Sequence, residues 1–286
     1  MSAIILDGKE IAKKVLKSVK IQGSAVAKTL GRPVSMVIDS IDPTYESKTY
    51  IKSKLKKAES LGFIANNLEL KSYISQLDLE NKIKALSDDA NIDGILIQLP
   101  IPNRLDSGKA IEKIDPKKDL DGLCSLNQHA LVSGLAVLIP CTPLGILKLI
   151  QEARVQLGSD NNLSGLHAVV IGRSSLVGRP IAQLLLAQNC TVTICHSKTT
   201  DIQEHCSKAD IIVSATGKPG LIKTAKKGSI VIDVGITYQN DTLLGDVDFE
   251  HVKELCAAIT PVPGGVGPMT VAMLMENLVN AAKLRF

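Results

Sequence analysis

A tyrosine and a lysine four residues apart have side chains suited to proton transfer. Tyr50 and Lys54 belong to a stretch with helical spacing of its apolar residues, so both leave the same face of a helix. A lysine in a partly dry cleft loses its proton more easily than one in water and can exchange protons with a substrate. Lys52, Lys56 and Lys57 lie beside it and are typical of a solvated helix face. Spacing alone leaves both interpretations of Lys54 open.

Gln98 and Asp121 are two further polar residues where chemistry is possible. Gln98 ends a run that is otherwise apolar, and a polar side chain there either bonds to the backbone or points into a site. Asp121 forms an Asp-Gly pair with Gly122, which is typical of a turn. Its functional interpretation is an acceptor for the N–H groups of a heterocycle. Both alternatives remain for each residue.

Residues 167–186 predict a strand, a glycine-bearing turn and a helix in that order. The β-branched run at 169–171 is typical of a strand buried on both faces, Gly172 ends it, and Gly178 opens an apolar helical pattern. Backbone N–H groups at such a helix start bind anions, as in the phosphate corner of a dinucleotide fold. Ser174 replaces the middle glycine of G-x-G-x-x-G. A tight turn without a ligand is therefore the alternative.

The end of the next predicted strand indicates which dinucleotide would bind. An NAD-binding domain usually carries an Asp or Glu there for the ribose hydroxyls. Residues 195–199 read Cys-His-Ser-Lys-Thr and contain no carboxylate. Together with Arg173 they form a donor-rich, cationic group that favours the 2′-phosphate of NADP. The alternative is that Arg173 and Lys198 lie on a solvated edge.

Residues 260–270, Thr-Pro-Val-Pro-Gly-Gly-Val-Gly-Pro-Met-Thr, form the least ordinary segment of the chain. Its prolines and glycines impose an unusual backbone just before a predicted helix. A loop constrained in this way is commonly built to hold a ligand, and a stiff connector between domains is the alternative.

Composition narrows the class of protein. The chain has 286 residues, of which 45% are hydrophobic, enough for one large or two ordinary domains. No apolar run approaches the about 18 residues of a membrane span, and the first residues become charged too early for a secretory signal. A net charge of +4 and 2% aromatic residues do not favour nucleic acid. We expect no membrane and no nucleic-acid partner.

The cysteines and histidines suggest neither a metal site nor a disulfide framework. The six cysteines are scattered without a C-x-x-C pair, and the five histidines show no ligand spacing. We therefore expect no metal. A reducing compartment, the cytoplasm, is the expected location.

The order of predicted elements indicates an α/β fold. Helices are expected at 7–30, 46–61, 77–86, 107–114, 142–149, from 178 and at 269–284, and strands at 34–38, 68–70, 93–100, 169–171, 191–195, 211–214, 230–233, 245–247 and 258–259. Residues 125–141 show no clear period. The alternation predicts two α/β domains with parallel sheets and a cleft between them, the second Rossmann-like. Ligands are expected beyond the carboxyl ends of the strands.

Several of these stretches together resemble one family, the bifunctional methylenetetrahydrofolate dehydrogenase/methenyltetrahydrofolate cyclohydrolase of one-carbon metabolism. The matching segments are Ser47-x-x-Tyr50-x-x-x-Lys54, residues 94–102, residues 117–122, residues 140–143, Gly172-Arg173-Ser174 with residues 177–180, and residues 260–270. They occur in the family's order over nearly the whole chain. Before the Tyr-Lys pair the family usually shows Val-Gly-x-x-Pro-Ala-Ser, and this chain departs from it with Ile-Asp-Pro-Thr-Tyr-Glu-Ser at 41–47.

The resemblance implies a two-step reaction. The family oxidises 5,10-methylenetetrahydrofolate by hydride transfer to NADP and hydrolyses the 5,10-methenyl product to 10-formyltetrahydrofolate, a supplier of purine biosynthesis. It also implies a homodimer formed through the nucleotide domain. The implied domains are a folate-binding catalytic domain at 1–140, onto which a C-terminal helix at 269–286 packs back, and a Rossmann-like NADP-binding domain at 141–268.

The resemblance also assigns roles to residues. Lys54 would be the main cyclohydrolase acid/base, Gln98 would tune it, Tyr50 would stack on the aminobenzoate ring and Asp121 would anchor the pterin. The other implied folate contacts are Leu99, Pro263, Gly264 and Gly265. The implied NADP contacts are Gly172, Arg173, Ser174, Val177, Gly178, His196, Ser197, Thr216, Gly217 and Ile236.

Two other functions stay open at this point. A shikimate-dehydrogenase-like NADP oxidoreductase shares two α/β domains and a Lys/Asp pair, but it gives no reason for the loop at 260–270 or for Tyr50. A folate- or nucleotide-binding protein without catalysis is the other, and the presence of Lys54, Gln98 and Asp121 argues against it.

Overall fold

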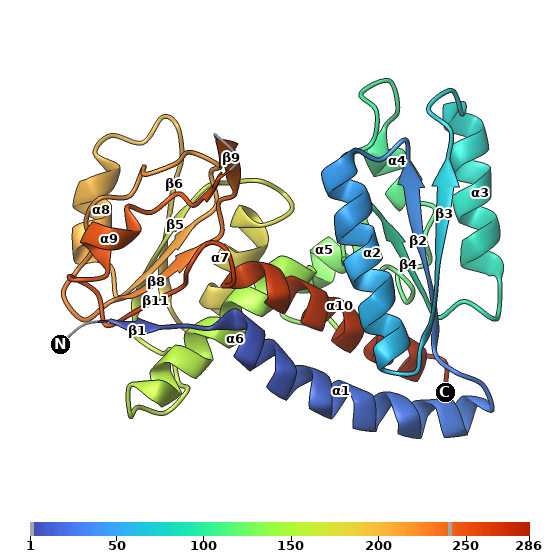
Figure 1. Ribbon diagram of the computed structural model, residues 1–286, viewed down its shortest axis with the longest axis horizontal. Coiled ribbons are helices and arrows are strands. Elements are labelled where there is room, and N and C mark those ends of the chain that lie inside the picture. Colours follow the sequence, from blue (N-terminus) through green and yellow to red (C-terminus); the bar gives the residue numbers. More distant parts are fainter. Residues whose placement is uncertain (1–2, 240–241) are drawn as a thin grey trace. The chain divides into compact units, whose positions relative to one another are not determined.

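The structure is a computed structural model that describes residues 3–239 and 242–286 (Figure 1). The chain forms two compact units, each of the α/β class. Unit 1 contains Met1–Lys13 and Thr142–Met273, and unit 2 contains Lys14–Cys141 and Leu274–Phe286. Two helices, α1 (Gly8–Leu30) and α10 (Val266–Lys283), contribute several residues to each unit, and α6 (Cys141–Gln156) has its first residue in unit 2 and the rest in unit 1.

Unit 2 is built on a three-stranded parallel sheet in the order β3-β2-β4. Between α1 and α6, the strands and helices of unit 2 follow one another in the order β2 (Ser35–Ile41), α2 (Tyr45–Ser60), β3 (Ile64–Leu70), α3 (Gln76–Asp88), β4 (Gly94–Ile97), α4 (Ser107–Ile111) and α5 (Ser125–Val132). The connections from β2 to β3 and from β3 to β4 run in opposite directions across the sheet. Right-handed crossovers then place α2 and α3 on opposite faces, as Figure 1 shows.

One buried apolar cluster of unit 2 lies under α3 and α4. Apolar residues of the three strands meet Leu79 and Ile83 of α3 and Ala110 and Ile111 of α4. The central strand β2 is buried over its whole length. Its carboxyl end and that of β4 are held side by side by the pairing of the two strands.

Unit 1 is built on a six-stranded parallel sheet in the order β1-β11-β8-β7-β5-β6. Its elements are β1 (Ile4–Ile5), α6 (Cys141–Gln156), β5 (His167–Ile171), α7 (Gly178–Ala187), β6 (Thr191–Cys195), α8 (Ile202–Lys208), β7 (Ile211–Ser214), β8 (Ile230–Asp233), β9 (Thr237–Gln239), β10 (Thr242–Leu244), α9 (Phe249–Val252) and β11 (Ala258–Ile259). From β5 the chain steps to β6 on one side, and then returns to β7 on the other. The carboxyl ends of β5 and β7 are therefore a topological switch point, where such sheets bind ligands.

Helices cover the larger sheet, with α8 and α9 on one side and α7 on the other (Figure 1). Cys206 of α8 and Val252 of α9 belong to the same buried cluster as Val169, Ile171 and Ile212 of the strands. All six cysteines of the chain are buried and free, and burial raises the pKa of the Cys206 thiol to about 12. These thiols therefore act as small apolar core groups.

Most expected elements are present, and the differences have local causes. Residues 125–141, expected to be irregular, contain α5, whose only buried residue is Leu131, so the helix lacks a periodic apolar face. The strand expected at 245–247 is wrong: β10 ends at Leu244, and Val247 forms a single bridge with Ile222. Helix α6 continues to Gln156, beyond the expected end at 149. Helix α10 begins at Val266, inside residues 260–270, which we call the proline-glycine loop.

Residues 3–13 belong to a different unit from the range expected for them. The sequence suggested a single domain at 1–140, whereas Met1–Lys13 group with Thr142–Met273. The cause is the pairing of β1 with β11, in which Ile4 is opposite Ala258 and Ile5 is opposite Ile259. A two-residue strand has too little sequence pattern to indicate its partner.

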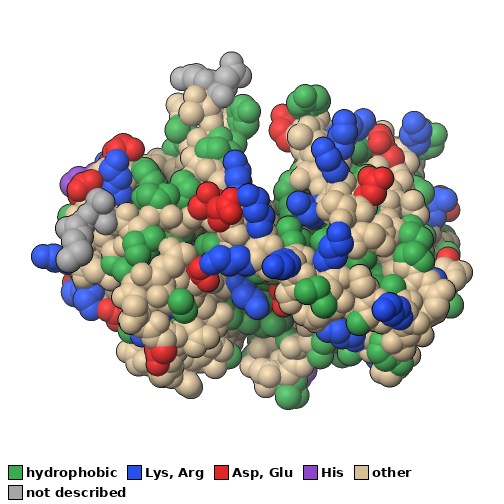
Figure 2. Space-filling view, turned by 60° about the horizontal axis from the view of Figure 1, so that its bottom comes forward, with side chains coloured by type: hydrophobic (Ala, Val, Ile, Leu, Met, Phe, Trp, Pro, Cys, Tyr) green, Lys and Arg blue, Asp and Glu red, His purple; other side chains and the backbone are tan. Residues whose placement is uncertain are grey.

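Charged side chains are mixed over the molecular face that Figure 2 shows, with Asp and Glu among the Lys and Arg. None of the described helices is long and apolar enough to cross a membrane. Among residues 3–239 and 242–286, no three His, Cys, Asp or Glu side chains are grouped so that they could hold a metal ion.

Candidate functional site

Lys54 differs from the other lysines of its helix by being buried. Its residue exposure is 5%, whereas Lys52 and Lys56 are exposed and Lys57 is half-buried. The inner face of α2 comprises Ile51, Lys54 and Ala58, at the spacing of one helical stripe. The helix therefore carries the Lys54 amine into unit 2, which the sequence allowed but did not establish.

Gln98 and Tyr50 enclose the Lys54 amine. The amine donates a hydrogen bond to Oε1 of Gln98 at 2.9 Å, and it lies 4.4 Å from the centre of the Tyr50 ring. The Gln98 amide is itself oriented, because its Nε2 donates to the carbonyl of Leu99 at 2.8 Å. The Gln98 side chain therefore bonds to backbone at one end and to Lys54 at the other, and its place in a site stays a prediction.

The strands explain why these groups meet. Gln98 directly follows β4, and its backbone N–H donates to the carbonyl of Asp39 in β2 at 2.7 Å. The segment before Asp121 lies along β4 on the other side, where Asp119 forms a parallel bridge with Ile95. Gln98 and Asp121 therefore follow neighbouring parallel segments and lie at the same edge, the carboxyl edge of the smaller sheet.

The electrostatics of this cluster favour a lysine that can give up its proton. Burial lowers the pKa of Lys54, and the negative charge of Asp121 acts against that shift. Gln98, the direct hydrogen-bond partner, is neutral and adds no charge that would hold the ammonium form. The result is a lysine with a lowered pKa next to one carboxylate and one aromatic ring.

Asn277 ties the backbone directly before Asp121 to the backbone at Ile139. It is fully buried in α10, and its Nδ2 donates to the carbonyl of Leu120 at 2.8 Å and to that of Ile139 at 2.7 Å. The sequence pattern did not single out Asn277. Its only signal is a polar residue in the otherwise apolar stripe of the C-terminal helix.

The segment at residues 41–47, which departs from the family pattern, leads into α2 through a left-handed residue and a helix cap. Asp42 stands where the family pattern has glycine, and its φ is +45°, in the left-handed region. Thr44 then caps α2, with its side chain accepting a hydrogen bond from the Ser47 N–H. The backbone therefore keeps a glycine-like turn, at the cost of strain at Asp42.

In unit 1, the turn after β5 is built for close backbone approach. Gly172 has a φ of +119°, and a Cβ on it would lie 2.5 Å from the carbonyl oxygen of Ala215. A Cβ on Gly178 would lie 2.2 Å from the carbonyl oxygen of Gly172. The Ser174 hydroxyl accepts hydrogen bonds from the N–H groups of Val177 and Gly178. Only glycine fits at 172 and 178, and the Ser174 hydroxyl fixes the backbone that leads into α7.

A hollow of about 370 Å³ lies at the switch point of the larger sheet. It is lined by residues that follow β5, β6 and β7, namely Ile171, Gly172, Arg173, His196, Ser197, Thr199, Ile202, Ala215, Thr216, Lys218 and Leu221. Two of the lining residues that the structure describes, Arg173 and Lys218, are cationic, and none of them is Asp or Glu. The hollow suits an anionic ligand such as a nucleotide phosphate.

The hollow differs in detail from the sequence expectation. Cys195, counted with the donor-rich group, is fully buried in the core and cannot contact a ligand there. Lys218 was not singled out, although its charge directly after Thr216-Gly217 is a signal in the sequence. Gly217 has a φ of +65°, and its carbonyl accepts from the Thr237 hydroxyl at 3.0 Å.

The proline-glycine loop lines a second hollow of unit 1, of about 260 Å³. Pro263, Gly264 and Gly265 line it together with Asp233 and Ile236, while Val234, Leu243, Lys9 and the rest of residues 261–268 complete the wall. A Cβ on Gly8 would lie 1.7 Å from the carbonyl oxygen of Gly265, so the start of α1 lies against the loop. The loop is thus held on several sides and shapes a concave surface.

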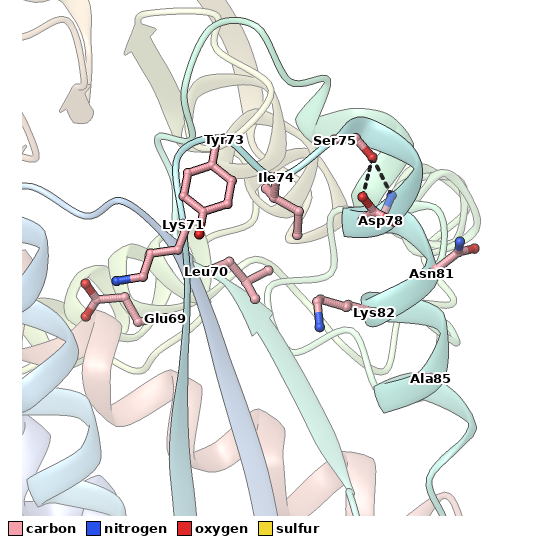
Figure 3. A pocket seen from close by; sticks show the side chains of 10 residues that line it. All are labelled: Glu69, Leu70, Lys71, Tyr73, Ile74, Ser75, Asp78, Asn81, Lys82 and Ala85. Carbon is pink, nitrogen blue, oxygen red and sulfur yellow. Dashed lines mark hydrogen bonds between the residues drawn. The ribbon is translucent and has the colours of Figure 1, made fainter.

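A further hollow, of about 610 Å³, opens beside β3 and α3 in unit 2. Figure 3 shows Tyr73 and Lys71 at one side of it and Lys82 on the helix at the other. None of the residues singled out from the sequence lines this hollow. Size alone therefore does not identify the site.

Comparisons with known proteins agree over the whole chain. The family model described as "Tetrahydrofolate dehydrogenase/cyclohydrolase, catalytic domain" matches residues 6–121, and the one described as "Tetrahydrofolate dehydrogenase/cyclohydrolase, NAD(P)-binding domain" matches residues 140–286. "Bifunctional protein FolD" of Acetivibrio thermocellus is 44% identical over 289 residues, covering 100% of this chain and 99% of that protein.

Solved structures are similar over the same length. The bifunctional enzyme FolD, methylenetetrahydrofolate dehydrogenase/cyclohydrolase, from Campylobacter jejuni has a TM-score of 0.94 and 39% identity, covering 100% of both chains. The Trypanosoma brucei N5,N10-methylenetetrahydrofolate dehydrogenase-cyclohydrolase (FolD), complexed with NADP cofactor and inhibitor, has a TM-score of 0.91 and 33% identity, covering 100% of this chain and 99% of that chain. The chain belongs to the tetrahydrofolate dehydrogenase/cyclohydrolase family.

Proposed function

We propose that this protein is a bifunctional enzyme of one-carbon metabolism that oxidises 5,10-methylenetetrahydrofolate with NADP and hydrolyses the 5,10-methenyltetrahydrofolate so formed to 10-formyltetrahydrofolate. The family matches and the full-length relatives support both activities. The single observation that carries the hydrolytic half is the buried amine of Lys54, held by Gln98 and lowered in pKa. A chain that only bound folate or nucleotide would have no use for that arrangement.

Lys54 is the acid/base of the hydrolysis in this proposal. Addition of water to the methenyl carbon releases a proton, and a neutral amine can accept it. Burial already lowers the pKa of Lys54, and a cationic methenyl substrate nearby would lower it further, because two like charges repel. Gln98 keeps the amine in place. The carboxylate of Asp121 accepts hydrogen bonds from the N–H groups of the pterin, and Tyr50 stacks on the aminobenzoate ring.

Oxidation of the methylene group needs less acid/base catalysis than the hydrolysis does. The folate nitrogen lone pair drives departure of the hydride, so rate comes from positioning the reacting groups. NADP, when bound, is the hydride acceptor. In the proposal Leu99, Pro263, Gly264 and Gly265 contact the folate.

The residues around the switch-point hollow fit NADP. Gly172 and Gly178 let the turn after β5 pack closely on neighbouring backbone, and a pyrophosphate would lie against this turn and the start of α7. Arg173, His196 and Ser197 line the hollow where a ribose 2′-phosphate would lie. Ser174, Val177, Thr216, Gly217 and Ile236 complete the proposed contacts.

The setting of the reaction is also a proposal. We place the enzyme in the cytoplasm as a homodimer that acts on tetrahydrofolate derivatives, with no nucleic-acid or membrane partner. Six free, buried cysteines support a reducing compartment. The dimer follows from the resemblance to the family.

The test follows absorbance with methylenetetrahydrofolate and NADP in the wild type, Lys54→Ala and Lys56→Ala. Lys56 is an exposed lysine of the same helix and serves as the matched control. Lys54→Ala should still form methenyl product and reduced cofactor but hydrolyse the product at least about 100-fold more slowly. Hydrolysis at the wild-type rate would remove Lys54 from the mechanism. A wild type that forms neither product would refute the dehydrogenase activity.

A further inference from the structure

We propose that Asp246 is a positioning residue of the cofactor site: its buried carboxylate holds the turn after β7, and the hollow at the switch point takes its shape from that turn. The inference rests on the proposed function, since it assumes that this hollow binds NADP. Asp246 does not line the hollow itself. It acts through residues that do.

The Asp246 carboxylate gathers donors from a single turn. Oδ2 accepts from the hydroxyl of Ser214 at 2.8 Å and from the N–H and hydroxyl of Thr216 at 2.7 and 2.9 Å. Oδ1 accepts from the N–H of Lys218 at 2.8 Å. Residues 214–218 are thus wrapped around one fully buried carboxylate. Hydrogen bonds to a charged acceptor are the strong ones, so the turn has little freedom.

The same carboxylate also packs against the turn after β8. A Cβ on Gly235 would lie 1.9 Å from Oδ1 of Asp246, so any side chain there would displace the carboxylate. Val234 and Ile236 flank this glycine and line the hollow formed by the proline-glycine loop. One side chain therefore spaces two turns, each of which lines a hollow of unit 1.

Asp233 holds Asp246 in return. Its Oδ1 and Oδ2 accept hydrogen bonds from the N–H groups of Asp246 and Val247, both at 2.9 Å. A Cβ on Gly245 would lie 2.0 Å from Oδ2 of Asp233, so the carboxylate lies directly against the backbone before Asp246. Asp246 packs on Gly235, two residues after Asp233, and Asp233 packs on Gly245, directly before Asp246. This reciprocal arrangement, the Asp233–Asp246 interlock, leaves neither turn free to move alone.

If Asp246 only stabilised the fold, its hydrogen bonds would not need to end on residues that line the hollow. Thr216 and Lys218 line the hollow directly, while Asp246 holds the backbone N–H groups of both. Releasing the turn would alter the wall of the hollow, yet the sheet strands β5, β7 and β8 would keep their ladders. The expected consequence is weaker cofactor binding in a folded protein.

The test compares Asp246→Asn with Asp248→Asn in the full chain. Asparagine keeps the volume of Asp246 but removes its charge and half of its acceptor capacity. We expect the KM for NADP and the calorimetric Kd for NADP to rise about tenfold or more, with kcat nearly unchanged. Hydrolysis of methenyltetrahydrofolate, assayed without NADP, should change much less than NADP binding, because Lys54 and Gln98 belong to unit 2. Asp248 caps α9 through the His251 N–H and should show no change in either measurement.

A milder variant keeps the proposal testable if Asp246→Asn fails to fold. Ser214→Ala removes one of the four donors and should raise the Kd for NADP about twofold to fivefold. An unchanged Kd in Ser214→Ala, or in a folded Asp246→Asn, overturns the positioning role. A wild type that binds no NADP instead refutes the proposed function, so the two failures are distinct.

Discussion

The Nζ atom of Lys54 lies 2.9 Å from Oε1 of Gln98, an amide oxygen that accepts a hydrogen bond from the lysine in either protonation state. A carboxylate in that place would favour the ammonium form. The amide positions the amine without opposing its deprotonation, while burial lowers the pKa of Lys54. Orientation and pKa are therefore controlled by different features, and they can be altered separately.

Gln98→Glu should make Lys54 a poorer base. A carboxylate within hydrogen-bond distance raises the pKa of a lysine, by about 1 to 3 for a close pair. The rate of methenyltetrahydrofolate hydrolysis should fall at least about tenfold near neutral pH and recover at higher pH, which a pH–rate profile measures. Gln98→Leu, which adds no charge, is the control and should keep the midpoint of that profile. An identical midpoint in wild type and Gln98→Glu would contradict the assignment.

Arg173→Ala should weaken NADP much more than NAD. The guanidinium lines the hollow after β5, where it would meet a 2′-phosphate that NAD lacks. We expect the KM for NADP to rise about tenfold or more, with little change for NAD. Arg179→Ala is the control, because Arg179 is exposed on α7 and does not line that hollow. Equal losses for both cofactors would count against the 2′-phosphate contact.

The sequence predicted the sheets because their signals are local. Buried parallel strands such as β5 and β8 read as short β-branched runs, and glycines at 172 and 178 mark the turn that needs them. The strand ends then indicated where polar residues would gather. Gln98 could be proposed as a site residue for this reason alone.

Features that depend on distant residues could not be predicted. Lys54 has lysine neighbours with the same local pattern, and only the packing of α2 buries it. The Asp233–Asp246 interlock joins residues thirteen apart to a turn at 214–218, and no periodicity links them. The pairing of β1 with β11 likewise spans nearly the whole chain. In each case the physical cause is a tertiary contact, which composition and spacing do not record.

Asp93→Asn should destabilise the fold of unit 2. Its fully buried carboxylate accepts hydrogen bonds from Arg32 at 2.7 and 2.8 Å and from Arg285 at 3.0 Å. Breaking such a buried pair leaves partly buried guanidinium groups without their counter-ion, and typically costs about 3 to 5 kcal/mol. Urea unfolding measures this loss. Glu204→Gln, in an exposed pair with Lys208, should cost less than about 1 kcal/mol, and equal effects would contradict the reasoning.

Asp39→Val should stabilise the protein at neutral and alkaline pH. Asp39 is fully buried in β2, and neither of its carboxylate oxygens has a hydrogen-bond partner among the residues that the structure describes. Burial raises its pKa to about 7, with the charge of Lys82 acting in the opposite direction. Between its ordinary pKa of 3.8 and about 7 the unfolded chain releases this proton before the folded chain does. The free energy of unfolding must therefore fall as pH rises through that interval.

Replacing Asp39 separates titration from packing. In Asp39→Asn the fall in unfolding free energy between about pH 4 and pH 7 should become shallower, because the titrating group is gone. In Asp39→Val the buried polar group is gone as well, and the protein should be more stable than wild type at about pH 8 by roughly 1 to 3 kcal/mol. Urea unfolding at several pH values tests both. A destabilised Asp39→Val at that pH would mean that the carboxylate has a partner or a role that its surroundings in β2 do not reveal.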